Sequence, residues 1–466
     1  MNFNFTDFEW KSQSFRIVLL ASLCQFLTSM VLNCMHVMLP DMSLELGISI
    51  ELLNWLTLVF LMTLLAFSIP ISKYVSHNGI KKFMKISTYG LIISLGIFAL
   101  SSNIEFLLIS RVMQGLNIAV LNICVYMIII QGIPENKVGQ ALGIVSSSGY
   151  VGMLIAPTVS GLITQFFGWR FVFIIIIIVL IFQLILIHFI KEEWKTDKKP
   201  IDNIGSLVFM ILICFLVYGL SSLNDDGLIY LIIAIIIAIA FVLMEKNKKY
   251  PVFKLSLLKN KSYVIGNYAA MICHVISFTV NYLLTIYLQV VNGLDSGIAG
   301  MVMMTTPIIM VIVSPYAGML ADKQDARLLS AAGMIFMTLG MVIFVFLEYL
   351  PFYMIFVALS FRGLGHGIFS SPNSKFVLTD IPSDDLAEAS ALLTSVKEFG
   401  RIISLAIFTA ICFVYMNNNS LYENIVGFTQ STYLMMIVTV VFGISSVVLL
   451  LISKFYLKDK TAPQID

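Results

Sequence analysis

Long apolar runs recur along the whole chain, and short polar segments separate them. A helix needs about 20 apolar residues to cross the roughly 30 Å hydrocarbon core of a bilayer, and the runs reach about that length. We therefore expect an all-α membrane protein. The pattern predicts about fourteen transmembrane helices, at residues 16–38, 52–72, 83–101, 105–131, 139–165, 169–190, 203–222, 227–244, 262–290, 297–320, 328–347, 351–376, 389–415 and 431–453.

The composition excludes a soluble globular protein. Of 466 residues, 59% are hydrophobic and 12% are charged, and the mean hydropathy is +0.96. Soluble domains are about half apolar and about a quarter charged. The polar start carries Asp7 and Glu9, and no small-residue cleavage site follows the first apolar run. We expect this run to be a retained span and not a cleaved signal peptide.

The distribution of charge predicts how the helices alternate across the bilayer. Lys and Arg favour cytoplasmic loops, and counting from an inner N-terminus places most of the 28 basic residues in inner segments. The outer loops hold acidic residues and one clear basic residue, Arg170. Both chain ends are therefore expected in the cytoplasm. The heavy use of Ile, Asn and Lys favours a prokaryotic cytoplasmic membrane.

Two polar linkers, near 191–202 and 245–261, divide the chain and enclose only two predicted spans. We therefore expect a domain of six helices at residues 1–190, linkers with two extra helices at 191–261, and a second domain of six helices at 262–466.

Weak internal similarity relates the two outer parts. Segment 72–82 resembles a worn copy of segment 318–327, and Arg111-Val-Met-Gln-Gly115 has a counterpart in Arg362-Gly-Leu-Gly-His-Gly367. Duplicated halves around a substrate site near the midplane are the plan of a transporter.

The segment from Gly318 to Arg327 carries charges that suit a conformational latch. Asp322, Lys323 and Arg327 join adjacent membrane helices at the predicted inner face. Such charges can bind helix ends and one another, and these contacts can form and break as the helices rock. An ordinary solvated turn is the alternative.

Polar residues within apolar spans identify a candidate cavity. Arg111 lies about two turns inside a span, where an unpaired cation is costly and normally faces the bundle interior. A role in proton coupling or in sensing substrate charge is one interpretation, and a structural Arg satisfied by backbone carbonyls is the other. Helical spacing places further polar residues on single faces, which must face one another or water. These stripes are Arg111, Gln114, Asn122 and Tyr126; Gln25, Ser29, Asn33 and His36; and Asn267, His274, Asn281 and Thr285. Hydrogen bonding between helices, without contact to substrate, is the alternative for each.

The chain resembles the major facilitator superfamily over nearly its whole length, and within it the fourteen-helix drug:proton antiporter group. Five motifs in the family's order carry the resemblance: Arg111, Gln114 and Gly115 in the fourth helix; Gly152, Ala156, Pro157, Ser160 and Gly161 in the fifth; Trp169 and Arg170 after it; Gly318, Leu320, Ala321, Asp322 and Arg327; and the stretch 389–400. The resemblance implies two six-helix bundles plus two extra helices.

The small residues of the fifth span allow two readings. Gly152, Ala156, Ser160 and Gly161 let helix backbones approach closely, and Pro157 favours a kink. In the family this motif is associated with antiporters and is thought to seal a helix interface against leak, which favours export over uptake. An ordinary packing seam would use the same residues.

The departures from the family concern its acidic residues. Val31 stands where the first helix usually has Asp, and no span has Asp or Glu near its predicted centre. His36, His274 and Glu398 remain as titratable candidates, although Glu398 lies near Lys397 and Arg401, which favours a local ion pair. Ser72 and Ser76 replace Gly and Asp in the first-half loop, so we expect a latch in the second half alone.

These observations predict a proton-coupled exporter of drugs or amphipathic small molecules that works by alternating access. An exporter of one metabolite with different or no proton coupling, and a non-transporting sensor, are the alternatives. The chain has no H-E-x-x-H or G-x-S-x-G motif, and its six Cys lack metal spacing, so we expect no enzyme activity, cofactor or metal. The expected partners are a small-molecule substrate, protons and lipid, without nucleic acid, and the expected state is a monomer.

Overall fold

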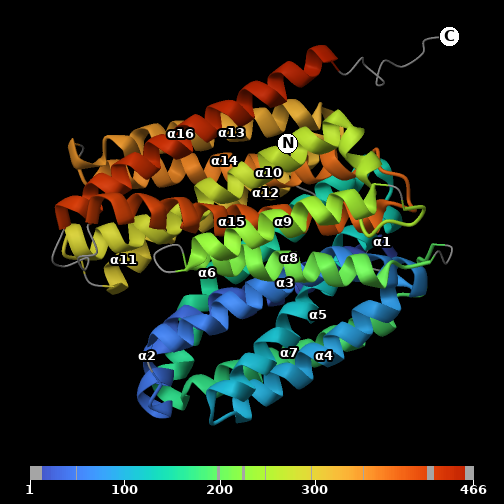
Figure 1. The fold of residues 1–466 in the computed structure, drawn as a ribbon, viewed down its shortest axis with the longest axis horizontal. Helices are drawn as coiled ribbons and strands as arrows, with labels where there is room; N and C mark the ends of the chain where they lie inside the picture. Colours follow the sequence, from blue (N-terminus) through green and yellow to red (C-terminus); the bar gives the residue numbers. More distant parts are fainter. Residues whose placement is uncertain are drawn as a thin grey trace.

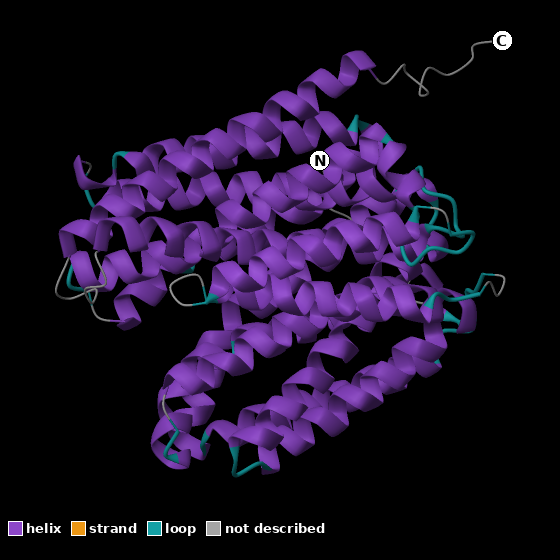
Figure 2. Cartoon of the chain, viewed as in Figure 1, coloured by secondary structure: helices purple, strands orange, loops and turns teal. Residues whose placement is uncertain are grey.

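A computed structural model describes residues 13–456, except 49, 197–199, 223–225, 247, 295, 350 and 417–424. Within these residues the chain is helical and has no strand (Figure 2). Thirteen of the described helices are long and apolar enough to cross a membrane. The remaining predicted span, 389–415, is also a long helix, α15 (Leu386–Met416), and it carries several charged residues.

The first half contains six long helices and a short one. Glycines make some of the turns between them: Gly168 joins the fifth and sixth long helices with φ of 89°, a backbone region that side chains rarely adopt. The predicted first span runs too far, because its helix ends at Asn33 and Cys34 separates it from the short helix. The elements are α1 (Gln13–Asn33), α2 (Met35–Leu46), α3 (Ile50–Asn78), α4 (Ile80–Leu100), α5 (Ile104–Gly132), α6 (Val138–Phe167) and α7 (Trp169–His188).

The second half contains six long helices as well. The predicted span 297–320 is two helices, because Pro307 has no N–H to donate to the carbonyl of Met303 and the helix restarts after Met304. The first helix of this half continues into two π-helical segments, Val280–Leu284 and Tyr287–Val291. The elements are α10 (Lys261–Thr279), α11 (Ser296–Met303), α12 (Thr305–Lys323), α13 (Ala326–Val345), α14 (Tyr353–Leu378), α15 and α16 (Ile425–Tyr456).

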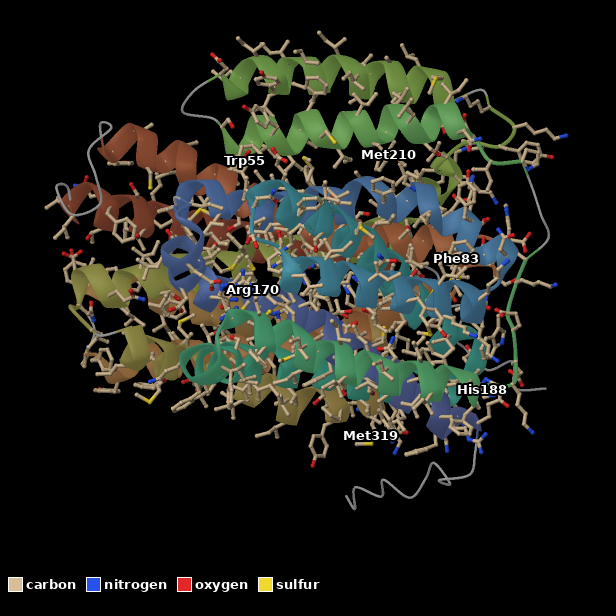
Figure 3. The ribbon with its side chains drawn as sticks, turned by 90° about the horizontal axis from the view of Figure 1, so that it is seen from below. Trp55, Phe83, Arg170, His188, Met210 and Met319 are labelled. Carbon is tan, nitrogen blue, oxygen red and sulfur yellow. The ribbon has the colours of Figure 1, made fainter. Side chains whose placement is uncertain are left out.

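The two extra helices, α8 (Asn203–Ser221) and α9 (Gly227–Glu245), form a peripheral pair, drawn in green in Figures 1 and 3. Much of α9 is exposed and rich in Ile, which suits contact with lipid. Ile213 and Val217 of α8 pack with Leu65 of α3 and Ile402 of α15. The pair is therefore peripheral, yet α8 contacts both halves.

The linkers around this pair are anchored at one end of the bundle. Lys248 forms ion pairs with Asp202 and Glu245, and the Glu245 carboxylate accepts a hydrogen bond from the backbone N–H of Val252. Burial raises the pKa of Asp202, but hydrogen bonds from Lys248 and the N–H of Gly205 outweigh it and hold this pKa below its ordinary value. These contacts keep Asp202 ionised at the N-terminus of α8.

Basic residues lie at the same end of the bundle as these linkers. We call this end the lysine-rich face and define it by Lys73, Lys254 and Lys375. Figure 3 places Phe83 and His188 at this end of the first half, and Trp55 and Arg170 toward the opposite end. At that opposite end Arg170 pairs with Glu45. The concentration of lysines is the feature from which we predict the cytoplasmic side.

We predict that the lysine-rich face is cytoplasmic. Green fluorescent protein fused after residue 466 should fluoresce, and alkaline phosphatase at the same position should be inactive. Fusions inserted between Ser222 and Asp226, which lie between α8 and α9, should show the reverse pattern. An active phosphatase at the C-terminus would contradict this orientation.

Candidate functional site

The carboxylate of Asp322 joins the two halves at the lysine-rich face. The backbone N–H of Gly139 donates to its Oδ1 and that of Gln140 to its Oδ2, both at 2.7 Å. These N–H groups belong to the first turn of α6, where free donors and the helix dipole favour an anion. Lys375 of α14 places its Nζ 2.5 Å from the same carboxylate. We call Asp322, Gly139, Gln140 and Lys375 the latch.

Arg327, which we expected in this latch, lies elsewhere. Its guanidinium pairs with Asp325 at 2.6 Å, and Asp325 also caps α13 by accepting from the Arg327 N–H. The carboxylate of Asp325 thus binds Arg327, and the cation that pairs with Asp322 is Lys375. Lys375 was not among the predicted site residues, because its only signal in the sequence is a cation within the predicted span 351–376.

Glycines bring α6 and α12 close enough for the latch to form. A Cβ on Gly143 would lie 2.6 Å from the carbonyl oxygen of Ser314, and Gly318 lies against Gly139 in the same way. The Ser147 hydroxyl donates to the carbonyl of Val311 at 2.7 Å. We call this contact the α6–α12 seam. Its backbones approach too closely for larger side chains at the glycine positions.

A second cross-half contact joins α3 to α15. Lys73 forms an ion pair with Glu388 at 3.2 Å, and the backbone N–H of Lys254 donates to the same carboxylate at 3.1 Å. Ion pairing between the halves is therefore not confined to the loop of the second half, and a latch in the second half alone stays a prediction. The charges are reversed relative to the latch. Ser72 and Ser76 carry no charge, so the charged residue at the end of α3 is the cation Lys73, and the acid, Glu388, lies in the first turn of α15.

Arg111 is buried in the first half and has no acidic partner among the described residues. Its Nη1 donates to Oε1 of Gln114 at 2.9 Å, and Gln114 donates to the Ser110 hydroxyl at 2.9 Å. The guanidinium carbon lies 4.9 Å from the centre of the Phe98 ring, close enough for a cation–π contact. Two of its nitrogens have no hydrogen-bond partner in the described part of the chain.

Arg362 occupies the matching position in the second half. It is 1% exposed, and its Nη2 donates to the carbonyl of Ser277 at 3.0 Å, while Nη1 donates to the Thr306 hydroxyl at 3.3 Å. A backbone carbonyl and a hydroxyl are neutral acceptors. Each half thus buries one arginine on neutral partners.

The other residues of the α5 face reach the opposite half. Asn122 and Tyr126 are half-buried, and the Tyr126 hydroxyl accepts a hydrogen bond from Lys397 Nζ at 2.7 Å. In α1, Asn33 donates to the carbonyl of Ser29 within its own helix. The side chain of His36 lies outside the described residues.

Part of the α1 stripe packs within the first half. A Cβ on Gly149 would lie 2.9 Å from the side chain of Gln25, and one on Gly152 would lie 2.6 Å from the carbonyl of Phe26 and 3.0 Å from Ser29. Gln25 and Ser29 therefore face the glycines of α6.

The remaining residues of the small-residue motif continue along α6. Ala156 and Ser160 are buried, and the Ser160 hydroxyl donates to the carbonyl of Pro157 at 3.2 Å. Pro157 and Gly161 are half-buried. The cross-half glycines Gly139 and Gly143 lie earlier in the same helix.

Two histidines meet between α10 and α14. The ring centres of His274 and His366 lie 5.7 Å apart, and Tyr150 of the first half packs edge-on against His366 at 5.6 Å. His366 Nδ1 lies 3.0 Å from the Ser277 hydroxyl. Asn281 is half-buried in the first π-helical segment. His366 was not among the predicted site residues, although His366 lies in segment 362–367, the counterpart of segment 111–115.

The prediction of a local ion pair at Glu398 is confirmed. Arg401 lies one helical turn away and contacts its carboxylate at 2.7 Å. This carboxylate is thus occupied by a cation of its own helix.

Two halves of six long described helices each, joined by polar contacts, have the architecture of a membrane transporter. The chain belongs to the Major Facilitator Superfamily, whose family model matches residues 21–405.

The relatives that this chain resembles include a riboflavin transporter and two multidrug proteins. The riboflavin transporter RibZ of Clostridioides difficile is 26% identical, over 85% of this chain and 88% of that protein. The multidrug resistance protein Stp of Mycobacterium tuberculosis is 24% identical, over 84% and 74%. The multidrug export protein EmrB of Escherichia coli is 25% identical, over 87% and 80%.

Solved structures share the fold at low identity. The human organic anion transporter MFSD10 superposes with a TM-score of 0.69 at 9% identity, covering 94% of this chain and all of that one. The proton:xylose symporter XylE gives 0.67 at 16% identity, covering 95% and 96%. These likenesses establish the fold alone.

We predict that Asp322→Asn opens the lysine-rich face. The amide keeps one acceptor but loses the charge that holds Lys375 and the first turn of α6, and hydrogen bonds to charged groups contribute about 1.5–3 kcal/mol each. Spin labels at Lys82→Cys and Asp380→Cys, which lie exposed on opposite halves, should show a new population at longer distance. The exposed Glu192→Gln on the same face is the matched control, and an unchanged distribution in Asp322→Asn would contradict the latch.

We predict that Gly143→Ala destabilises the α6–α12 seam. The added methyl must push backbone atoms apart, which costs about 1–3 kcal/mol when a packed site cannot relax. Thermal unfolding of the purified protein should begin at a lower temperature. Gly96→Ala is the control, since a Cβ there meets nothing within 4 Å and alanine favours helix. Equal melting temperatures for the two variants would argue against a tight seam.

Proposed function

We propose that this transporter exports drugs or other amphipathic small molecules in exchange for protons, by alternating access of its two halves. The latch is the observation that carries the proposal. Its carboxylate, Asp322, lies on the second half. The backbone N–H groups that bind this carboxylate lie at the start of α6, on the first half. In this mechanism residues 1–190 and residues 262–466 are the two units that move.

The latch suits a switch because its strength is intermediate. Two hydrogen bonds from backbone N–H groups of α6 join the halves at the lysine-rich face, and the ion pair with Lys375, which lies within the second half, holds the carboxylate in place. Each charged bond contributes about 1.5–3 kcal/mol, and part of this is regained from water when the face opens. A substrate or proton that favours one state by a few kcal/mol can therefore shift the equilibrium.

Proton coupling requires a titratable group near the contact between halves. The family's first-helix Asp is replaced by Val31, which is fully buried. His274 and His366 are the candidates that the fold brings together, and Tyr150 connects them to the first half. Imidazole is the side chain whose unperturbed titration lies nearest neutral pH.

Transport of one specific metabolite is the second candidate. The similarity to a protein named riboflavin transporter, over 85% of this chain, favours it. A neutral, aromatic and hydroxylated molecule needs no carboxylate counterion, which fits a site without the usual first-helix Asp. Riboflavin is therefore the first neutral compound to assay.

We predict that a substrate drives proton movement and that Arg111→Ala lowers the rate at least tenfold. Loss of the guanidinium removes the buried charge on which Gln114 is oriented. The purified protein is reconstituted in liposomes with an internal pH-sensitive dye, a pH gradient is imposed, and lipophilic cations, riboflavin and anionic metabolites are added in turn. Arg111→Lys, which keeps the charge, should retain more activity than Arg111→Ala.

Two outcomes would favour the alternatives. Movement of a compound without a proton signal would indicate a transporter that is not proton-coupled. Absence of any movement, with the protein shown to be folded, would favour a non-transporting sensor.

A further inference from the structure

We infer that the ammonium group of Lys397 binds the negative charge of the substrate, so that the transported compounds are organic anions with an apolar body. Lys397 lies where α15 of the second half meets α5 of the first half. This inference rests on the proposed transport function and specifies its substrate class.

Lys397 lies deep in the bundle. It follows the first residue of α15, Leu386, by a distance of about 16 Å at 1.5 Å per residue, which is about half of the hydrocarbon thickness. A charged side chain at such depth is costly, and in membrane proteins it normally pairs with an opposite charge or serves a substrate path.

The partners of Lys397 are all neutral. Its Nζ donates to the Tyr126 hydroxyl at 2.7 Å and to the Ser374 hydroxyl at 3.5 Å, and it lies 5.1 Å from the centre of the Tyr126 ring. Within the described residues no carboxylate lies within 4.0 Å of this nitrogen. The half-buried ammonium therefore has capacity for an anionic partner.

The surroundings of Lys397 are basic. Arg401 lies four residues after Lys397 on the same face of α15. Arg362 donates to Ser277, which also contacts His366. The carboxylate nearest in sequence, Glu398, is engaged by Arg401 at 2.7 Å. A cationic substrate would be repelled here, whereas an anion would complete the charge balance.

The position also explains how an anion would be coupled to transport. The Lys397–Tyr126 hydrogen bond crosses between the halves, so it must break when they separate. An anion bound to the ammonium replaces this bond to a neutral hydroxyl with a stronger one, in which donor and acceptor carry opposite charges. The Tyr126 ring adjoins the ammonium and offers a face for an apolar or aromatic body.

Binding of two dyes with one ring system tests the inference. The full chain is placed in lipid nanodiscs, and fluorescence anisotropy measures the affinity for fluorescein, an anion, and rhodamine 123, a cation with the same xanthene core. We expect wild type to prefer fluorescein and Lys397→Gln to bind it about 10- to 100-fold more weakly, the effect of one charged hydrogen bond. Lys397→Glu should reverse the preference.

Controls separate binding from folding. Lys397→Arg keeps the charge and should stay within a few-fold of wild type, and Lys246→Gln, exposed at the end of α9, should not change either affinity. Equal fluorescein binding by wild type and Lys397→Gln would overturn the inference. So would a wild-type preference for rhodamine 123, or wild type binding neither dye.

The same dyes in liposomes distinguish this inference from the proposed function. Fluorescein binding that depends on Lys397, without export, would overturn export and leave the anion site standing. Export of rhodamine 123 with no fluorescein binding would support export and overturn the anion site.

Discussion

The close approach of α6 and α12 is the constraint on which the latch depends. Asp322 can accept two backbone N–H groups only because Gly139, Gly143 and Gly318 leave no side chains between the helices. The N-terminus of α6 thus acts as an anion site within the protein, and the anion is supplied by the other half. Both hydrogen bonds end on one carboxylate, so a separation of α6 from α12 would lengthen both together.

The Lys73–Glu388 ion pair is a second charged contact between the halves. Lys73 and Glu388 exchange the positions of acid and base relative to the latch. Glu388 also accepts from the Lys254 N–H, and Lys73 donates to the carbonyl of Pro251. The linker that follows the two extra helices therefore touches both partners of this ion pair. The extra pair is peripheral to the halves, but its linker is part of the closed face.

The helices were predictable from the sequence because an apolar run of about 20 residues is long enough to cross a membrane as a helix. The break at Met304 could have been anticipated from Pro307, whereas the π-helical segments after Thr279 have no comparable signal. Asp322 was predictable as a latch residue from its place between spans. Its cation was not, since spacing along one helix does not reveal that Lys375 faces α12. Lys397 was passed over for the same reason, because its partner Tyr126 is 271 positions away.

Because Val31 stands where the family's first helix usually has an acid, no carboxylate at this position can balance a buried cation. In the described residues Arg111, Arg362 and Lys397 rest on neutral partners, and Glu398 is occupied by Arg401. A buried cation without a counterion raises the energy of whichever state excludes water from it. An incoming anion would relieve this cost in the state that binds it, and its release to the other side would restore the Lys397–Tyr126 bond. An anionic substrate, as proposed for Lys397, would thus supply the charge that balances the buried cation, and its binding energy would favour the separation of the two halves.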